Sequence, residues 1–149
     1  GKPLHFKGSR FHRIVPGFAL QAGDLTRGDG HGGESIYGPL FHDEWERGWV
    51  RHSEPFLLSM ANRGRDTQSS QFFVTLQAEP MLDGRHVCFG RVVQGTHVVK
   101  MIEAAGTRSG DPAQEVLIVD SGQLGPDGQL IQEPILLEDQ MTGPHGYEL

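Results

Sequence analysis

Short apolar runs rich in valine, isoleucine and phenylalanine dominate the hydrophobic pattern of this chain. Runs of this kind, bounded by turn residues, are typical of β-strands. The predicted strands are residues 11–15, 18–21, 56–60, 71–76, 87–93 and 115–120. Turn chemistry separates them, notably in residues 27–33 and 82–85, where Gly and Asp are frequent. The pattern therefore predicts a mostly β protein.

One segment, residues 96–105, has the helical period instead of the strand period. Its predicted apolar face consists of Val98, Met101, Ile102 and Ala105. Thr96 is a candidate N-cap, because its side-chain oxygen can accept a hydrogen bond from the first turn. Gly106 is a candidate stop signal. One helix is therefore expected among the strands.

The bulk properties predict one soluble globular domain. A chain of 149 residues can bury a core, and its 21 glycines suit a compact barrel whose loops need positive φ angles. No apolar run is long enough to span a bilayer, and one cysteine allows no disulfide framework, which together favour a soluble intracellular protein of undetermined compartment. That cysteine, Cys88, lies in an apolar run and is predicted to be a packed core thiol.

The formal net charge of −6 is concentrated at the C-terminal end. Five of the 19 acidic residues and none of the 13 Lys and Arg residues lie beyond Gly122, so the remainder is almost neutral and nucleic acid is not an expected partner. We expect one domain over residues 1–125 and an acidic extension with Pro and Gly over residues 126–149. The extension is either a solvated linker or a segment that docks, through an apolar cluster at 135–137, on its own barrel or on an assembly partner.

Arg13 is the most informative residue because it lies inside an otherwise apolar run, residues 11–18. An arginine in such a run either extends its head to water or has a specific task. Two later segments favour the second interpretation: residues 57–62 (Leu-Leu-Ser-Met-Ala-Asn) and 69–74 (Ser-Ser-Gln-Phe-Phe-Val).

Together these three segments resemble the cyclophilin family of peptidyl-prolyl cis/trans isomerases. The resemblance extends over residues 1–125 and includes residues 21–24, 32–38, 82–87 and 120–124 in the same order. It implies a closed antiparallel β-barrel of about eight strands with flanking helices, which side chains fill so that ligands bind outside. It also implies that the family's N-terminal strands are missing from this chain, and residues 1–6 look more like the larger multidomain members.

The resemblance implies catalysis of rotation about Xaa-Pro bonds in protein segments, with no cofactor and no metal. The rotation has a barrier of about 18–20 kcal/mol because amide resonance must be broken. Arg13 is the implied catalytic residue: its planar, charged guanidinium would bind the substrate carbonyl and the nitrogen lone pair that twisting localises.

The resemblance also implies an apolar pocket for the proline ring, with polar groups around it. The pocket is assigned to Phe18, Met60, Phe73 and Leu82, and the remaining substrate-binding positions are His12, Gln21, Ala61, Asn62, Gln71, Met81 and His86. Phe73 is the expected floor. The two glutamines would orient Arg13 or bind substrate carbonyls. Backbone groups of Ala61 and Asn62 would pair with the peptide.

Two positions depart from the best-known members. Met81 occupies the position of a tryptophan that is the main determinant of cyclosporin binding, so weak cyclosporin binding is expected. Arg63, with Arg65 close by, replaces small residues at a secondary pocket that contacts residues preceding proline. These arginines are expected to narrow that pocket and to favour acidic or polar side chains.

Three other signals predict no site. The glycine-rich residues 28–33 do not open a helix after a buried strand, as a phosphate loop must. Residues 42–46 lack a second histidine at metal-ligand spacing, so a solvated loop with a buried Trp45 is expected. Ser59 lacks the context of a hydrolase nucleophile.

A second function from another class stays open at this point. The same groove would also suit a proline-peptide binding module or a structural subunit of a larger assembly with little turnover. The presence of Arg13 favours the enzyme, since a purely structural relative would be free to lose it.

Overall fold

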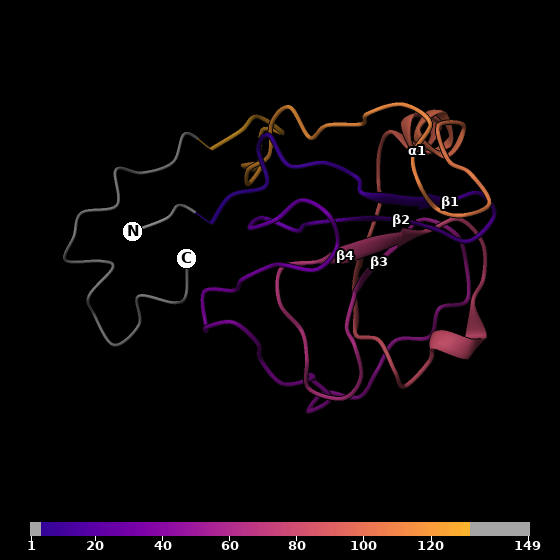
Figure 1. Ribbon diagram of the computed structural model, residues 1–149. Helices are drawn as coiled ribbons and strands as arrows, with labels where there is room; N and C mark the ends of the chain where they lie inside the picture. Colours follow the sequence, from indigo (N-terminus) through magenta and orange to yellow (C-terminus); the bar gives the residue numbers. More distant parts are fainter. Residues whose placement is uncertain (1–3, 132–149) are drawn as a thin grey trace.

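The computed structural model describes residues 4–131, and most of its regular structure is one sheet of short strands (Figure 1). The elements are β1 (Arg13–Val15), β2 (Ala19–Ala22), β3 (Leu57–Met60), β4 (Phe72–Thr75), the 3-10 helix η1 (Pro80–Leu82), β5 (Cys88–Arg91) and α1 (Thr96–Glu103). The strands pair antiparallel in the order β1-β2-β4-β3-β5. The prediction of a mostly β, antiparallel fold with one α-helix is confirmed.

A tight turn sets the register between β1 and β2. Gly17 has a φ of 77°, and the N–H of Phe18 donates to the carbonyl of Val15 over 3.0 Å. Proline followed by a residue with positive φ is the pattern of a type II turn, and glycine adopts that angle without strain. The turn places Arg13 directly opposite Gln21.

Side chains on the two faces of the sheet have different neighbours, because successive residues of a strand point to opposite sides. Ile14, Leu20 and Val74 lie at paired positions on one face and are buried in the main core. Gln21 and Phe73 are paired on the other face. Each face therefore carries its own cluster, and the second face is available for a site.

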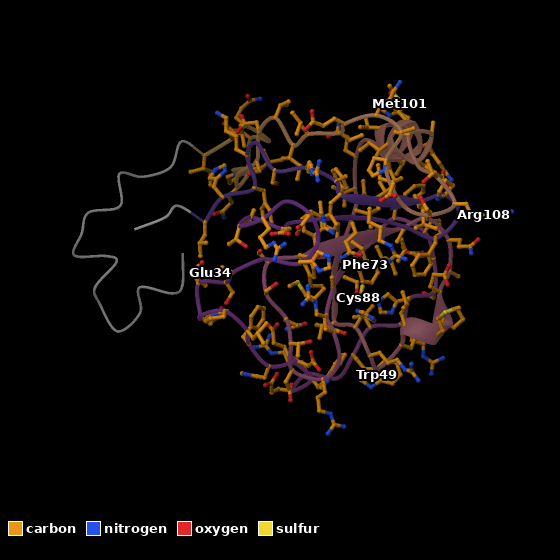
Figure 2. All side chains as sticks on the ribbon, in the orientation of Figure 1. Glu34, Trp49, Phe73, Cys88, Met101 and Arg108 are labelled. Carbon is orange, nitrogen blue, oxygen red and sulfur yellow. The ribbon has the colours of Figure 1, made fainter. Side chains whose placement is uncertain are left out.

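Helix α1 lies beside β1 on the side of the main core (Figure 1). Val99, Ile102 and Ala105 pack into that core. Val98 and Met101 are 46% and 70% exposed, and Figure 2 shows Met101 on the outer side of the helix. The predicted apolar face was therefore wrong for these two residues. Because Val98 and Val99 are both apolar, the sequence is compatible with two orientations of the helix. Only the contact with the sheet selects one of them.

The ends of α1 also differ from the expectation. Its N-cap is Gly95, with a φ of 88°, and the side chain of Thr96 forms no cap. Beyond the last helical residue, Gly106 passes close to β1, where an added Cβ would lie 2.7 Å from the carbonyl oxygen of Ile14. Glycine is required there by the close approach of two backbones.

Closure into the predicted barrel of about eight strands is not shown by residues 4–131. The sheet of this part of the chain has five strands with β1 and β5 at its ends. The predicted strand at residues 115–120 is absent. Instead, this segment pairs irregularly with the residues that precede β1, and the two together form a short ribbon. In this ribbon Phe11 N–H donates to Val116 O (3.0 Å) and Ile118 N–H donates to Ser9 O (2.8 Å).

The predicted C-terminal extension begins inside a short turn. Leu124 forms a bridge with Leu130, and the N–H of Gly125 donates to the carbonyl of Gln129 over 2.8 Å. Residues 132–149, including the apolar cluster predicted to dock, lie outside the described residues. Within residues 4–131, no helix has the length and hydropathy needed to cross a bilayer.

The orientation of α1 generates a test with two neighbouring valines. We expect Val99→Ala to lower the free energy of unfolding by about 1–3 kcal/mol, because it removes buried methyl groups from the core. Val98→Ala, at an exposed position of the same helix, should change it by less than about 0.5 kcal/mol. Urea denaturation of both variants measures the difference, and equal effects would contradict the observed helix face.

Candidate active site on the second face of the sheet

A small cluster of apolar side chains, which includes residues predicted for the proline pocket, lies on the face of the sheet that points away from α1, where Figure 2 shows Phe73 and Cys88. Its buried members are Ala19, Phe73 and Leu82, and the half-buried Phe18 and Ala61 pack against them. Three of the four residues predicted for the pocket are thus brought together. Ala19 was missed by the sequence analysis, although its position two residues before Gln21 in β2 puts it on the same face.

Met60 does not join this pocket through its side chain. It is paired with Phe72 in the β3–β4 register, one position from the Ser59–Phe73 pair, so its side chain points to the opposite face. Its backbone carbonyl remains at the site, where it accepts a hydrogen bond from His86 Nδ1 over 2.9 Å. Met60 therefore positions a rim residue and does not line the pocket.

His86 stands at the rim with its ring edge on the pocket floor. The rings of His86 and Phe73 meet at 81° with centroids 5.3 Å apart, which is a favourable edge-to-face contact. Burial lowers the pKa of His86, although the Met60 carbonyl opposes this. The imidazole is therefore mostly neutral at pH 7, with the Nδ1 proton donated to Met60.

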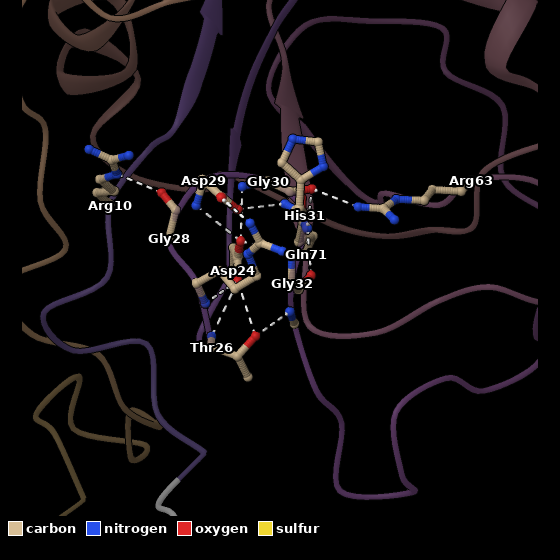
Figure 3. A network of polar contacts seen from close by, with 12 residues as sticks. Arg10, Asp24, Thr26, Gly28, Asp29, Gly30, His31, Gly32, Arg63 and Gln71 are labelled. Atoms are coloured by element: carbon tan, nitrogen blue, oxygen red, sulfur yellow. Dashed lines mark hydrogen bonds and ion pairs between the residues drawn. The ribbon is translucent and has the colours of Figure 1, made fainter.

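Two glutamines, Gln21 and Gln71, form a polar chain on this face, and Figure 3 shows Gln71 beside Gly30 and Gly32. Gln71 Nε2 donates to the carbonyls of Gly30 (2.9 Å) and Gly32 (2.7 Å), and Gln71 Oε1 accepts from Gln21 Nε2 (2.9 Å). Gln21 Oε1 has no donor within residues 4–131. Since Gln21 is paired with Arg13 on the same face, that free oxygen is available to a guanidinium.

Arg13 is exposed on this face and lies against the backbone of Gly110, where an added Cβ would come within 3.0 Å of the arginine Cγ. Within residues 4–131 its guanidinium forms no hydrogen bond or ion pair. A partner-free cation near an apolar pocket is suited to an anionic or carbonyl-rich ligand.

Asn62 directly follows Ala61, which packs against the apolar cluster. Its side chain is held by two bonds, from Nδ2 to the carbonyl of Arg85 (2.8 Å) and from the N–H of Gly64 to Oδ1 (3.2 Å). Its own N–H and carbonyl have no partner within the described chain. The N–H of Ala61 is already donated to the carbonyl of Gln71 over 3.1 Å, so only the Ala61 carbonyl is available.

The loop over residues 24–33 is folded around one carboxylate (Figure 3). Asp24 accepts hydrogen bonds of 2.9–3.2 Å from the backbone N–H groups of Thr26, Arg27, Asp29, Gly30 and Gly32. Burial alone would raise the pKa of Asp24, but these N–H groups outweigh it and hold that pKa far below its usual range. The glycine-rich loop thus binds an anion that belongs to the chain itself.

His12 supports the same loop instead of joining the pocket. An added Cβ at Gly30 would lie 2.8 Å from its ring, and its buried Nδ1 has no partner within the described residues. Burial also lowers the pKa of His12.

A second cavity of about 260 Å³ adjoins the apolar pocket. It is lined by Gln21, Gly30, His31, Gly32, Gly33, Pro39, Leu40, Ala61, Asn62, Arg63, Thr67, Ser69 and Gln71. Arg63 donates to the carbonyl of Gly30 over 3.2 Å and forms no ion pair within residues 4–131. Arg65 is exposed and is not among the lining residues, and Met81 is 68% exposed beside the pocket wall.

No group of His, Cys, Asp and Glu in residues 4–131 is suited to hold a metal ion, and His42 only approaches Glu46, at 3.6 Å. Trp45 is half-buried, not buried as expected. Cys88 is buried, and burial raises the pKa of its thiol, as a packed core residue requires.

Known proteins are similar to this chain over most of its length. The model of the family described as cyclophilin type peptidyl-prolyl cis-trans isomerase/CLD matches residues 2–123. Peptidyl-prolyl cis-trans isomerase D of Mycosarcoma maydis is 53% identical over 144 residues, 96% of this chain, and the chain spans 35% of that relative's length. The crystal structure of a cyclophilin type peptidyl-prolyl cis-trans isomerase of Cryptosporidium parvum has a TM-score of 0.71 and 38% identity, and covers 77% of this chain and 72% of that one.

The carboxylate of Asp24 generates a prediction about pH. Because its pKa is lowered on folding, the stability it contributes is present above its ordinary value of 3.8 and is lost as the pH falls below that value. We expect Asp24→Asn to lower the free energy of unfolding at pH 7 by about 2 kcal/mol or more, since an NH2 group replaces one of the two oxygens that accept from the buried N–H groups.

Urea denaturation between pH 7 and pH 2.5 checks this. The loss of stability in acid should be smaller in Asp24→Asn than in the unsubstituted protein. The exposed Asp120→Asn is the matched control and should leave both the stability and its pH dependence unchanged. An acid dependence of Asp24→Asn equal to that of the unsubstituted protein would contradict the assignment.

Proposed function

Because the chain belongs to the cyclophilin-type peptidyl-prolyl cis-trans isomerase family, we propose that it accelerates rotation about Xaa-Pro bonds in flexible protein segments. One observation supports the proposal for this chain: the guanidinium of Arg13, without a partner in residues 4–131, shares a sheet face with the apolar cluster around Phe73. The reaction forms and breaks no covalent bond, so a pocket, a set of backbone partners and a charged donor are sufficient.

The apolar pocket would receive the proline ring. The ring packs on Phe73 between Ala19 and Leu82, while His86 covers the rim. The free N–H and carbonyl of Asn62 bind the peptide backbone in a short strand-like pairing. These contacts hold the residues that flank the prolyl bond and leave the bond itself free to rotate.

Arg13 would stabilise the twisted amide. In the planar ground state the nitrogen lone pair is delocalised into the carbonyl, and twisting localises it on nitrogen. A guanidinium that hydrogen-bonds this region therefore interacts more strongly with the transition state than with either planar isomer, which is the differential binding that catalysis needs. Gln21, held by Gln71, supplies the oxygen that orients the guanidinium.

The second cavity would select the residues that precede proline. Arg63 faces it without an ion-pair partner in the described chain, and His31 is the other basic residue of its lining. No carboxylate lines the cavity. We infer a preference for acidic side chains at these substrate positions.

Met81 supports a smaller proposal on inhibitor binding. Its exposed thioether side chain has neither the N–H donor nor the flat surface of a tryptophan. We expect weak cyclosporin binding, and Met81→Trp should raise the affinity in a fluorescence titration. Equal affinities of the two proteins would contradict it.

The role of Arg13 is tested by exchange spectroscopy on a short Xaa-Pro peptide. Arg13→Ala should lower kcat/KM by about 100-fold or more, which is typical for the loss of one donor to a transition state. Arg13→Lys should recover only part of the loss, because an ammonium has no planar fork. Arg47→Ala, at an exposed loop position, is the control and should leave the rate unchanged.

The result also separates the two functions considered from the sequence. An isomerisation rate that collapses in Arg13→Ala supports the enzyme. Peptide binding by the unsubstituted protein without acceleration would make the site a proline-peptide recognition module, and the proposed activity would be wrong.

The role of Arg63 is tested with peptides that carry Glu, Gln or Lys two positions before proline. A partly solvated ion pair contributes about 0.2–1 kcal/mol, so the Glu peptide should be favoured over the Gln peptide by up to about fivefold in kcat/KM. Arg63→Ala should remove the preference for the Glu peptide and leave kcat/KM for the Gln peptide unchanged. A preference that survives both in Arg63→Ala and in 0.5 M salt would contradict the assignment.

A further inference from the structure

His52 is a completely buried histidine that lies beneath the candidate site and that sequence analysis did not single out. Its side chain is 0% exposed. Its backbone N–H and its ring Nδ1 both contact Asp83 Oδ1, over 2.6 and 3.0 Å, and its Nε2 lies 2.7 Å from the hydroxyl of Ser59. Both ring nitrogens are therefore used, by partners 31 and seven residues away along the chain.

These contacts define the tautomer of the ring. An ionised carboxylate only accepts hydrogen bonds, so Nδ1 carries a proton and donates it to Asp83. The backbone N–H of His52 is the largest cause that lowers the pKa of Asp83, which keeps this carboxyl ionised at neutral pH. In the neutral ring Nε2 then accepts the hydroxyl proton of Ser59.

The order Asp83, His52, Ser59 is that of a nucleophile triad, but the geometry excludes this role. Ser59 and His52 are both 0% exposed, so no substrate reaches the hydroxyl. The contacts of the ring point to a structural connection with the proline pocket instead.

The imidazole of His52 contacts the pocket floor directly. It stacks on the ring of Phe73 with centroids 6.2 Å apart and an angle of 20°, while His86 meets the same ring edge-on. Phe73 thus has one aromatic neighbour in a stacked arrangement and another in a T-shaped arrangement. Its tilt depends on where the His52 ring is held.

His52 also connects to the pocket wall. Asp83 directly follows Leu82 and is the C-cap residue of η1, and the N–H of Glu79 at the start of η1 donates to the His52 carbonyl over 2.8 Å. One buried residue is therefore bonded to both ends of the helix that carries Leu82 and is stacked on the floor formed by Phe73.

We propose that His52 is a positioning residue that fixes the tilt of Phe73 and its separation from Leu82, and thereby fits the pocket to the twisted prolyl amide. This rests on the proposed isomerase function, because it assigns a task within the same site. Asp83 and Ser59 act through His52 by holding its two ring nitrogens.

The test compares His52→Gln with two variants of its partner. His52→Gln removes the stacked ring and should lower kcat by about 10- to 100-fold, as displacements of about 1 Å in a site do. KM should change less than threefold, because the ground-state contacts at Asn62 are independent of His52. Asp83→Asn keeps an acceptor oxygen, so its kcat should stay within about threefold of that of the unsubstituted protein. The kcat of Asp83→Ala should fall as much as that of His52→Gln.

A second readout does not depend on turnover. With ¹³C-labelled phenylalanine, the ring signals of Phe73 should shift in His52→Gln and in Asp83→Ala but not in Asp83→Asn. His97→Gln, an exposed histidine on α1, is the matched control and should change neither the signals nor the rate. Thermal unfolding measured on every variant shows which of them are folded.

The outcomes separate this inference from the proposed function. If the unsubstituted protein does not isomerise peptides, the proposed function fails. The positioning role of His52 is then judged by whether His52→Gln shifts the Phe73 signals and lowers the affinity for an Xaa-Pro peptide. A folded His52→Gln protein with unchanged kcat and unchanged Phe73 signals would overturn the inference. If His52→Gln does not fold, Ser59→Ala is measured in its place. A folded Ser59→Ala protein whose Phe73 ring signals do not shift would also overturn the inference.

Discussion

The alternation of side chains across an antiparallel sheet is the constraint on which the rest of the structure depends. Because Arg13 is paired with Gln21 and Gln21 with Phe73, one register aligns a cation, an amide and an aromatic ring across three strands. The neighbouring positions, such as Ile14 and Leu20, fill the main core. A slip of one residue would exchange the two sets, which would bury the cation and expose the core. The core and the candidate site are therefore specified by the same pairing.

The polar side of the site is organised before any ligand arrives. Five backbone N–H groups bind the carboxylate of Asp24, and the loop they form presents the carbonyls of Gly30 and Gly32 to Gln71. Gln71 then holds Gln21 beside the arginine. The entropy of ordering this chain of bonds is lost during folding, so little remains to be lost when a substrate binds. The proposed catalysis of bond rotation would depend on such preorganisation, because it involves no covalent chemistry.

The charges of the described chain separate into paired and unpaired groups with different tasks. Arg27 pairs with Asp29, and Lys100 pairs with Glu103, at exposed positions where such pairs contribute little to stability. Arg13 has no partner within residues 4–131, although it shares a sheet face with the apolar cluster around Phe73. The proposed isomerase function assigns this unpaired guanidinium to the substrate, and such a local conflict between stability and function is common at active sites.

Local sequence predicted five of the six proposed strands and the turn between β1 and β2, because β-branched runs and a Pro-Gly pair act over short distances. Only the tertiary structure decided the remainder. Val98 and Val99 are equally apolar, so contact with the sheet selected the buried one. The face of the sheet to which the Met60 side chain points could be assigned only from the pairing register of β3 and β4. His52 has no apolar or motif signal of its own, since its partners are seven and 31 residues away and meet it only when the chain is folded.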